Sequence, residues 1–204
     1  MTVGENLRIA VFCASRPGTN PKFTAAAESL ANALYSKNWS LVYGGGNRGL
    51  MGSVAGTLFE KGGKVHGIIP RALIRREVEG EMDIGSVTIV ESMHERKEMM
   101  AANSDAFVAL PGGFGTLDEL VEIITWSQIG IHAKPIVLFN ADGFFDNFLK
   151  MVEDFYESGF VDEETRGILS VATTANGVIE AIEEYVPPEG RLTLSWDEKL
   201  DLKS

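Results

Sequence analysis

The chain is poor in cysteine and lacks long apolar runs. Its 204 residues include one cysteine, Cys13, so no disulfide can form within the chain, and a reducing compartment is expected. Cys13 lies in an apolar run and is interpreted as a small buried hydrophobe rather than a nucleophile. No run approaches the roughly 20 apolar residues of a membrane span, and residues 1–8 lack the charged-then-apolar layout of a signal peptide. We therefore expect a cytoplasmic protein with no membrane partner.

Basic residues are also scarce. The chain has 18 Lys and Arg against 29 Asp and Glu, giving a formal net charge of −11 and a pI of about 4.8. This balance argues against nucleic acid and acidic lipid as partners. An anionic small molecule would be repelled by the overall field, so its site must be locally positive. A helix N-terminus or a few placed arginines and lysines can provide that charge.

Two common kinds of catalytic site are not indicated. The three histidines, His66, His94 and His132, show no metal-ligand spacing, and carboxylates do not cluster around them. No serine occupies a nucleophile elbow, so a Ser–His–Asp triad is not predicted. We expect neither a metal nor another cofactor.

Short apolar runs alternate with helical patterns along the chain, which predicts a doubly wound α/β domain with a mostly parallel sheet flanked by helices. We expect a single domain over 1–204, with a core over about 7–186 and a polar, loosely held tail over 187–204. Residues 71–85 are mixed and charged and give no clear prediction. The expected strands are 7–14, 41–43, 65–69, 87–90, 106–110, 136–139 and 171–173, and the expected helices are 21–37, 50–61, 92–104, 116–130, 144–158 and 177–185.

The most informative segment is 111–119, Pro-Gly-Gly-Phe-Gly-Thr-Leu-Asp-Glu. It joins an expected buried strand to an expected helix, and such a glycine-rich turn points backbone N–H groups at one spot that favours a phosphate. Glu119 would place a carboxylate beside that anion. The alternative is structural, because Thr116 to Glu119 also fits a capping box that only satisfies helix-end donors.

A second glycine-rich turn, over residues 44–52, follows the expected strand 41–43. Its first six residues match the G-x-G-x-x-G spacing, but no acidic residue lies about 20 positions on to hold a ribose, so a dinucleotide fingerprint is not supported. A structural turn packed beneath the first loop has equal weight.

A third segment, 93–97, reads Met-His-Glu-Arg-Lys on an expected helix. Arg96 offers a planar fork for phosphate or carboxylate. Arg96 and Lys97 point about 100° apart on a helix, so they need not serve the same group. The alternative is a solvated charged face.

Three motifs in this order resemble the Lonely Guy (LOG) family of cytokinin riboside 5′-monophosphate phosphoribohydrolases, long mislabelled as lysine decarboxylases. They are Tyr43-Gly-Gly-Gly-x-x-Gly-Leu-Met-Gly52, Met93-His-x-Arg-Lys97 and Pro111-Gly-Gly-x-Gly-Thr-x-x-Glu119. The likeness runs from about 9 to 185. It implies a Rossmann-like domain and a homodimer or larger assembly of dimers. It also implies cleavage of the N-glycosidic bond of an N6-modified or plain adenosine 5′-monophosphate to free base and ribose 5-phosphate.

The resemblance also assigns residues. Arg96 and Glu119 match the family's catalytic pair, and Glu77 matches a substrate contact in a segment one residue longer than the usual pattern. The loop after the first strand reads Ala14-Ser15-Arg16 where the family usually has Gly-Ser-Ser, so Arg16 is a departure that could add a phosphate contact or change base preference. The remaining residues that match substrate contacts are Lys97, Gly112, Gly113, Phe114, Gly115, Thr116, Leu117, Asp118 and Thr125.

These assignments suggest a mechanism in which the loop 112–116 grips the 5′-phosphate and Glu119 stabilises positive charge on the ribose. One strong carboxylate candidate is visible, so the two-carboxylate scheme of glycosidases is not supported at this stage. Three alternatives remain: a general nucleoside monophosphate nucleosidase, a non-catalytic nucleotide carrier or sensor, and a lysine decarboxylase. The last needs a lysine holding pyridoxal phosphate, and no lysine lies in a recognisable setting for it.

Overall fold

The computed structural model describes residues 6–81, 83–189, 191–192 and 194. Seven strands form one sheet in the order β4-β3-β2-β1-β5-β6-β7, and every neighbouring pair is parallel. The predicted doubly wound α/β class is confirmed. The strands are β1 Arg8–Phe12, β2 Ser40–Tyr43, β3 Val65–Pro70, β4 Ser86–Val90, β5 Ala106–Ala109, β6 Ile136–Phe139 and β7 Leu169–Ala172. The α-helices are α1 Pro21–Ser36, α2 Gly49–Glu60, α3 Ile74–Glu77, α4 Met93–Ala102, α5 Phe114–Gln128, α6 Asp146–Glu157, α7 Glu163–Arg166 and α8 Ala175–Glu183, with short 3-10 turns at Arg71–Leu73 and Ala141–Gly143.

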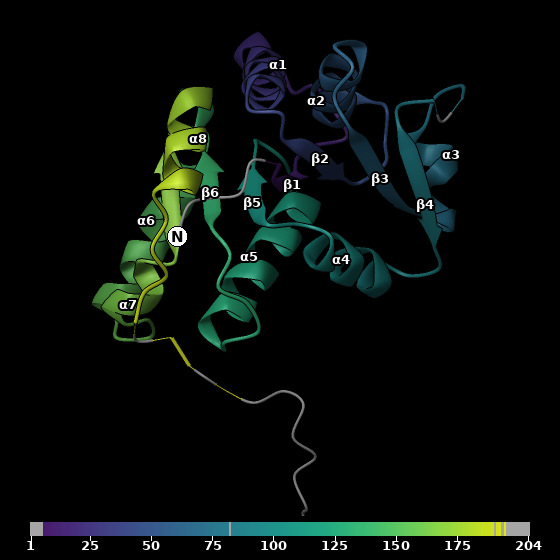
Figure 1. The fold of residues 1–204 in the computed structure, drawn as a ribbon. Coiled ribbons are helices and arrows are strands. Elements are labelled where there is room, and N and C mark those ends of the chain that lie inside the picture. The colour runs from purple at the N-terminus through teal and green to yellow at the C-terminus, as the bar shows by residue number, and fades with distance from the viewer. Residues whose placement is uncertain (1–5, 82, 190, 193, 195–204) are drawn as a thin grey trace, which may run out of the picture.

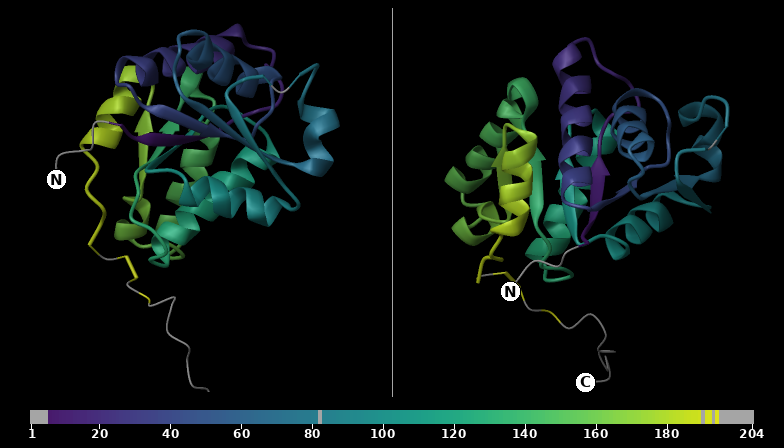
Figure 2. Two further views of the ribbon diagram at one scale, coloured as in Figure 1. Left: turned by 45° about the vertical axis from the view of Figure 1, so that its right-hand side comes forward. Right: turned by 45° about the horizontal axis from the view of Figure 1, so that its top comes forward.

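The central strands are apolar because helices cover both faces of the sheet. Along β1, Ile9 and Val11 pack toward the helices of one face, while Ala10 and Phe12 pack toward the other. Helices α1, α2 and α8 lie on the first face, and α4 and α5 lie on the second (Figure 1). Helix α3 lies beside β4 at the edge of the sheet farthest from α6 and α7 (Figure 2). The result is a three-layer arrangement whose strands all point their carboxyl ends the same way.

The chain reverses its direction of winding between β1 and β5, which are neighbours in the sheet. A point where the strand order reverses leaves a crevice beyond the carboxyl ends, because the two connections depart to opposite sides. Two loops meet there, since the Ala14 N–H donates to the Pro111 carbonyl at 3.2 Å. The turn after β5 therefore sits at the position where sheets of this class bind ligands.

Several helices begin at side-chain caps. Asn20 caps α1 by accepting the Lys22 N–H, with Pro21 as the first helical residue, as predicted. Thr174 caps α8 by accepting the Gly177 N–H at 3.1 Å. The expected start of that helix at residue 177 was therefore wrong by two residues, because the Thr174 cap was overlooked.

Other differences concern short or terminal segments. Residues 71–85, which gave no prediction, contain the short helix α3, and α7 was not predicted because four residues show no periodicity. The tail was expected to be loosely held, yet the Leu192 N–H donates to the Gln128 carbonyl at 3.1 Å and Arg191 Nη1 donates to the His132 carbonyl at 2.6 Å. That prediction was wrong for these two residues, and most of the tail beyond them lies outside the described residues. Among the helices of the described ranges, none has the length and apolarity needed to cross a bilayer.

Candidate active site

A cleft of about 390 Å³ opens at the carboxyl edge of the sheet. This volume falls within the range of about 300–1,000 Å³ that is usual for small-molecule sites. Segments that follow each of the strands β1 to β5 contribute to its wall, so residues far apart in sequence meet there. The lining residues are Cys13, Ala14, Ser15, Arg16, Met51, Leu73, Glu77, Met93, Arg96, Gly113, Gly115, Thr116 and Glu119.

The turn after β5 forms one end of this cleft, where the sequence predicts an anion. Helix α5 begins at Phe114, with Gly113 as N-cap and no side-chain cap hydrogen bond. Thr116 and Glu119 therefore lie inside the helix, and the capping-box interpretation was wrong. The backbone N–H groups of the first helical turn have no intrahelical acceptor, and the helix dipole adds positive potential there. The positive site that an acidic protein needs for an anion is thus provided by backbone.

Close packing explains the glycine at position 112. A Cβ on Gly112 would collide with the side chain of Thr116, which is buried at 3 % exposure. The threonine side chain occupies the space under the turn and faces the cleft. Gly112 thus lets the backbone lie directly against the Thr116 hydroxyl group.

Arg96 and Glu119 form a buried ion pair in the cleft. Arg96 Nη2 lies 3.8 Å from Glu119 Oε1, and the two residues are 5 % and 7 % exposed. Arg96 Nε has no hydrogen-bond partner within the described part of the chain, while Nη1 points at the Met93 sulfur at 3.8 Å. Buried guanidinium donors are normally satisfied, so a free one facing a cleft is suited to bind a ligand oxygen.

The environment of Glu119 favours its neutral form. Burial raises the pKa of Glu119 to about 7, with smaller contributions from the negative charges of Asp118 and Glu77, and Arg96 opposes the rise. A carboxyl group whose pKa lies near neutrality can exchange protons under working conditions, which suits acid–base chemistry.

Glu77, at the end of α3, places a second carboxyl group in the same cleft. Its carbonyl accepts the Asn47 N–H at 3.1 Å, which ties α3 to the second glycine turn. Its Oε2 atom is buried and has no hydrogen-bond partner among the described residues, and burial raises the pKa of Glu77 despite the opposing charge of Arg96. The cleft therefore holds two carboxyl groups, and Glu77, which the resemblance assigned as a substrate contact, is the second of them.

The second glycine turn plays a structural role. Gly49 packs against the backbone of Ser15 and Arg16, and the Met51 N–H donates to the Ala14 carbonyl at 3.2 Å. These contacts are with the loop after β1 and not with the loop 111–119, beneath which the structural alternative placed the turn, so that alternative stays a prediction. The turn also makes room for the ion pair, because the Arg96 guanidinium passes directly over Gly44.

Gly44→Ala is expected to lower activity while leaving the fold intact. Gly44 has no positive φ, so its backbone accepts alanine, but the new Cβ would push the Arg96 guanidinium away from Glu119. We expect kcat to fall at least tenfold and the melting temperature to change by a few degrees. Gly56→Ala is the matched control, because a Cβ there meets nothing within 4 Å. Equal activities of the two variants would show that Arg96 needs no fixed position.

Comparison with known proteins identifies the family. A family model described as "possible lysine decarboxylase" matches residues 51–182. The cytokinin riboside 5′-monophosphate phosphoribohydrolase LOG3 of Arabidopsis thaliana is 46% identical over 192 residues, which cover 93% of this chain and 89% of that protein. The cytokinin riboside 5′-monophosphate phosphoribohydrolase LOG of Oryza sativa subsp. japonica is 47% identical over 193 residues, which cover 95% of this chain and 79% of that protein. The chain belongs to the LOG family.

Solved structures agree with the LOG fold at greater distance. The molybdenum cofactor carrier protein of Chlamydomonas reinhardtii superposes with a TM-score of 0.66 at 22% identity, covering 87% of this chain and 96% of that one. The molybdenum cofactor binding protein of Rippkaea orientalis gives a TM-score of 0.65 at 21% identity, covering 88% and 97%. At this level of identity the likeness concerns the fold alone.

Some residues that LOG resemblance assigned to the substrate lie away from the cleft lining. Lys97 Nζ pairs with Asp118 and Glu122 at 3.0 Å each, which joins α4 to α5. Thr125 Oγ1 donates to the Val121 carbonyl, and Leu117 packs against the core. Phe114 is 93 % exposed. Gly112 is likewise not among the lining residues, although it packs against Thr116. The structure brings Glu77, Arg96, Gly113, Gly115, Thr116 and Glu119 together in the cleft, and the substrate contacts of all the assigned residues stay predictions.

Other lining residues were not predicted as site residues. Cys13 follows the last residue of β1, and burial raises the pKa of its thiol, so it remains a neutral apolar wall. Met51 and Met93 were part of the quoted motifs, and Leu73 lies in the segment that gave no prediction. The position of a residue just beyond a parallel strand was the signal that could have identified Cys13.

His132 has a structural role. His132 Nε2 lies 3.0 Å from the Ile123 carbonyl, and its Nδ1 accepts the Lys134 N–H at 3.2 Å. Burial lowers the pKa of His132 to about 4, so the ring is neutral and fixes the turn after α5. No group of three or more potential ligands among the described residues could hold a metal ion.

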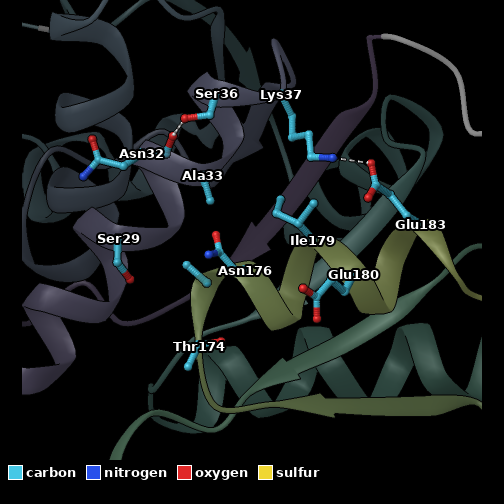
Figure 3. A pocket seen from close by; sticks show the side chains of 11 residues that line it. Ser29, Asn32, Ala33, Ser36, Lys37, Thr174, Asn176, Ile179, Glu180 and Glu183 are labelled. Atoms are coloured by element: carbon cyan, nitrogen blue, oxygen red, sulfur yellow. Dashed lines mark hydrogen bonds and ion pairs between the residues drawn. The ribbon is translucent and has the colours of Figure 1, made fainter.

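A larger hollow of about 630 Å³ lies between α1 and α8, away from the glycine turns (Figure 3). Its wall is made of helix side chains, including Ser29, Asn32 and Asn176, and Lys37 pairs with Glu183 across it at 2.7 Å. Lys37 and Glu183 therefore neutralise each other at their end of the hollow. Size alone therefore does not identify the site, and the smaller cleft has the unpaired buried groups.

Proposed function

We propose that this chain hydrolyses the N-glycosidic bond of N6-modified adenosine 5′-monophosphates to give the free base and ribose 5-phosphate, with Arg96 and Glu119 as catalytic residues. One observation carries the proposal: a buried Arg96–Glu119 pair faces the same cleft as the unpaired N–H groups at the start of α5. LOG relatives bear the name cytokinin riboside 5′-monophosphate phosphoribohydrolase, which supports the substrate class.

The phosphate anchors the substrate at the β5–α5 turn. Backbone N–H groups of the first turn of α5 and the Thr116 hydroxyl donate to its oxygens. Anchoring one end of the nucleotide positions the glycosidic bond beside the catalytic pair. The binding energy of the phosphate thus holds the reacting bond in the orientation that the reaction needs. This also explains how a protein of net charge −11 attracts an anion.

The chemistry takes place beside Glu119. As the glycosidic bond stretches, the ribose ring gains positive charge, as in other glycoside cleavages. The carboxylate of Glu119 stabilises this charge and accepts a proton from the attacking water. Arg96 binds ribose or phosphate oxygens through its free donors and keeps Glu119 in place. Loss of either residue would be expected in a carrier or sensor, and the chain retains both.

A substrate panel tests the proposal. Incubation with AMP, isopentenyladenosine monophosphate, the corresponding ribosides and other nucleoside monophosphates is expected to release free base, measured by chromatography. The monophosphates should exceed the ribosides at least 100-fold in kcat/KM, equivalent to about 3 kcal/mol of transition-state stabilisation from the phosphate. Equal rates for riboside and monophosphate would contradict phosphate anchoring. Equal rates for plain and N6-modified AMP would instead indicate a general nucleotide nucleosidase.

Two further expectations stay predictions, the first from LOG resemblance and the second from composition. These are assembly as a homodimer or larger oligomer and location in the cytoplasm. A small-molecule partner is supported by the cleft and by the names of the relatives. Molar mass in solution would measure the oligomeric state.

A further inference from the structure

The Glu77 carboxyl group has no role in the proposed mechanism. Glu77 Oε2 has no hydrogen-bond partner among the described residues, although Glu77 lines the cleft that contains Arg96 and Glu119. Leaving a buried carboxyl oxygen unpaired costs free energy, because the oxygen gives up its hydrogen bonds to water. A protonated carboxyl group bears that cost more easily than an ionised one and can donate a hydrogen bond to a ligand.

Glu77 stands at the end of the cleft opposite the phosphate turn. Helix α3 follows β3, whereas the phosphate turn follows β5, and β2 and β1 lie between them in the sheet. Glu77 itself packs against the turn after β2, because a Cβ on Gly46 would lie 3.2 Å from Glu77 Cβ. At about 4.8 Å between neighbouring strands, the turns after β2 and β5 are roughly two strand spacings apart. In the binding mode proposed above, a nucleotide anchored by its phosphate at the β5–α5 turn would extend its base toward Glu77, and Glu119 would flank the sugar.

Several charged groups act on the two carboxyls. Arg96 attracts both of them, and the negative charge of Glu77 disfavours ionisation of Glu119. Arg76 from α3 adds to the attraction on Glu77, and Lys97 and Asp118 act on Glu119 with opposite signs. The thiol of Cys13, at the end of β1, stays neutral. Arg96 therefore acts on both acids, the buried Glu119 and the half-buried Glu77, while Arg16 also lines the cleft. The mutual repulsion of the two carboxylates means that the site resists the loss of the second proton more than the loss of the first.

We propose that Glu77 and Glu119 act as a carboxyl pair that shares one proton, in which Glu77 protonates the leaving base while Glu119 accepts a proton from water. This inference rests on the proposed function. The bond between ribose C1′ and the base nitrogen breaks, and its electron pair stays on the base. The Glu77 carboxyl delivers its proton to a ring nitrogen, so the base leaves neutral. The water oxygen bonds to C1′, and the water proton passes to the Glu119 carboxylate, so one nucleotide and one water give base and ribose 5-phosphate.

A shared proton predicts a bell-shaped pH profile. The two carboxyls interact, so the proton lost near pH 7 belongs to the pair, and above that pH both groups are ionised and no acid remains. Turnover of the wild-type protein should therefore fall as the pH rises above about 7, and fall again in acid when both groups are protonated. A kcat that keeps rising beyond pH 8 would overturn the proposal without any variant.

Glu77→Gln separates a proton donor from a binding residue. The amide keeps the shape but holds no transferable proton, so kcat on a purine nucleotide should fall about 10²- to 10³-fold with KM changed less than threefold, and the alkaline limb should disappear. The variant should act nearly normally on 4-nitrophenyl ribofuranoside 5-phosphate, because nitrophenolate leaves without protonation. Glu119→Gln should fail on both substrates. Glu79→Gln is the matched control, since Glu79 lies two residues away with its side chain 77 % exposed and paired to Arg48.

The outcomes distinguish this inference from the proposed function. Unchanged kcat of Glu77→Gln on the nucleotide would overturn the role of Glu77, and so would an equal loss on both substrates, which would indicate positioning or folding. In either case the wild-type protein would still release base. If the wild-type protein released base from no nucleotide, the proposed function itself would be wrong.

Discussion

Glu119→Gln is expected to reduce turnover of nucleoside monophosphates about 10³-fold or more while nucleotide binding changes little. The substitution removes the negative charge that faces the ribose and the group that accepts the water proton, and both matter chiefly in the transition state. Released base would be measured by chromatography, and binding by calorimetry. Glu98→Gln is a control of the same chemistry, because Glu98 is exposed on α4. Release of base at the wild-type rate would remove Glu119 from the mechanism.

The same variant should be more stable than the wild-type protein above neutral pH. The pKa of Glu119 is raised to about 7 in the folded state, so the folded protein holds this proton more tightly than the unfolded chain does. The free energy of unfolding therefore falls as the pH rises from about 4.5 to about 7, and the glutamine variant escapes this loss. The gain should be on the order of 2–3 kcal/mol at pH 8 and vanish near pH 4.

Urea unfolding at both pH values measures this difference. Glu98→Gln should change stability by less than about 0.5 kcal/mol at either pH. A Glu119→Gln protein that is less stable than wild type at pH 8 would show that the carboxylate is well stabilised in the fold. In that case the acid–base role assigned to its raised pKa would lose its physical basis.

Arg96→Ala is expected to have the second large effect, lowering kcat/KM at least 10³-fold and raising KM at least tenfold. Arg96 is the cation that attracts both carboxyls of the cleft, and its free donors are assigned to the substrate. Without it the pKa of Glu119 should rise further, so the carboxylate would be largely protonated at pH 7. Steady-state kinetics across pH would reveal both effects.

Arg96→Lys tests the geometry of the guanidinium. A lysine keeps the charge but lacks the planar fork, so it should recover only part of the loss. Arg166→Ala is the control. Arg166 on α7 pairs with Glu153 on α6, and neither residue lines the cleft. Full activity of Arg96→Ala would contradict the role given to the buried pair.

Sequence patterns predicted the central fold well because strands buried on both faces are continuous apolar runs. Segments such as Ala106–Ala109 and Ile136–Phe139 were located closely for this reason. The patterns failed where structure depends on few residues or on distant contacts. Helices α3 and α7 have four residues each, too few for a helical period, and Arg191 is held by the carbonyl of His132, which is distant in sequence.

The candidate site was predicted in part for similar reasons. The glycine turn after β5 could be predicted from its own residues, because glycines stand between an apolar run and a helical pattern. Arg96 and Glu119 were assigned by family motifs. The burial of Arg96 and Lys97 could not be predicted, because an isolated charged helix is typical of a solvated surface, and only the packing of α4 against α5 shows otherwise. Glu77 was assigned to the substrate by family resemblance, but its position beside Glu119 in the cleft could not be derived from its segment, which shows no periodicity.

The crystal structure of the Glu119→Gln protein with a bound nucleoside 5′-monophosphate tests the central claim most directly. The account predicts that phosphate oxygens accept hydrogen bonds from the first N–H groups of α5, with the base extending toward Glu77. A phosphate bound away from the β5–α5 turn would contradict it.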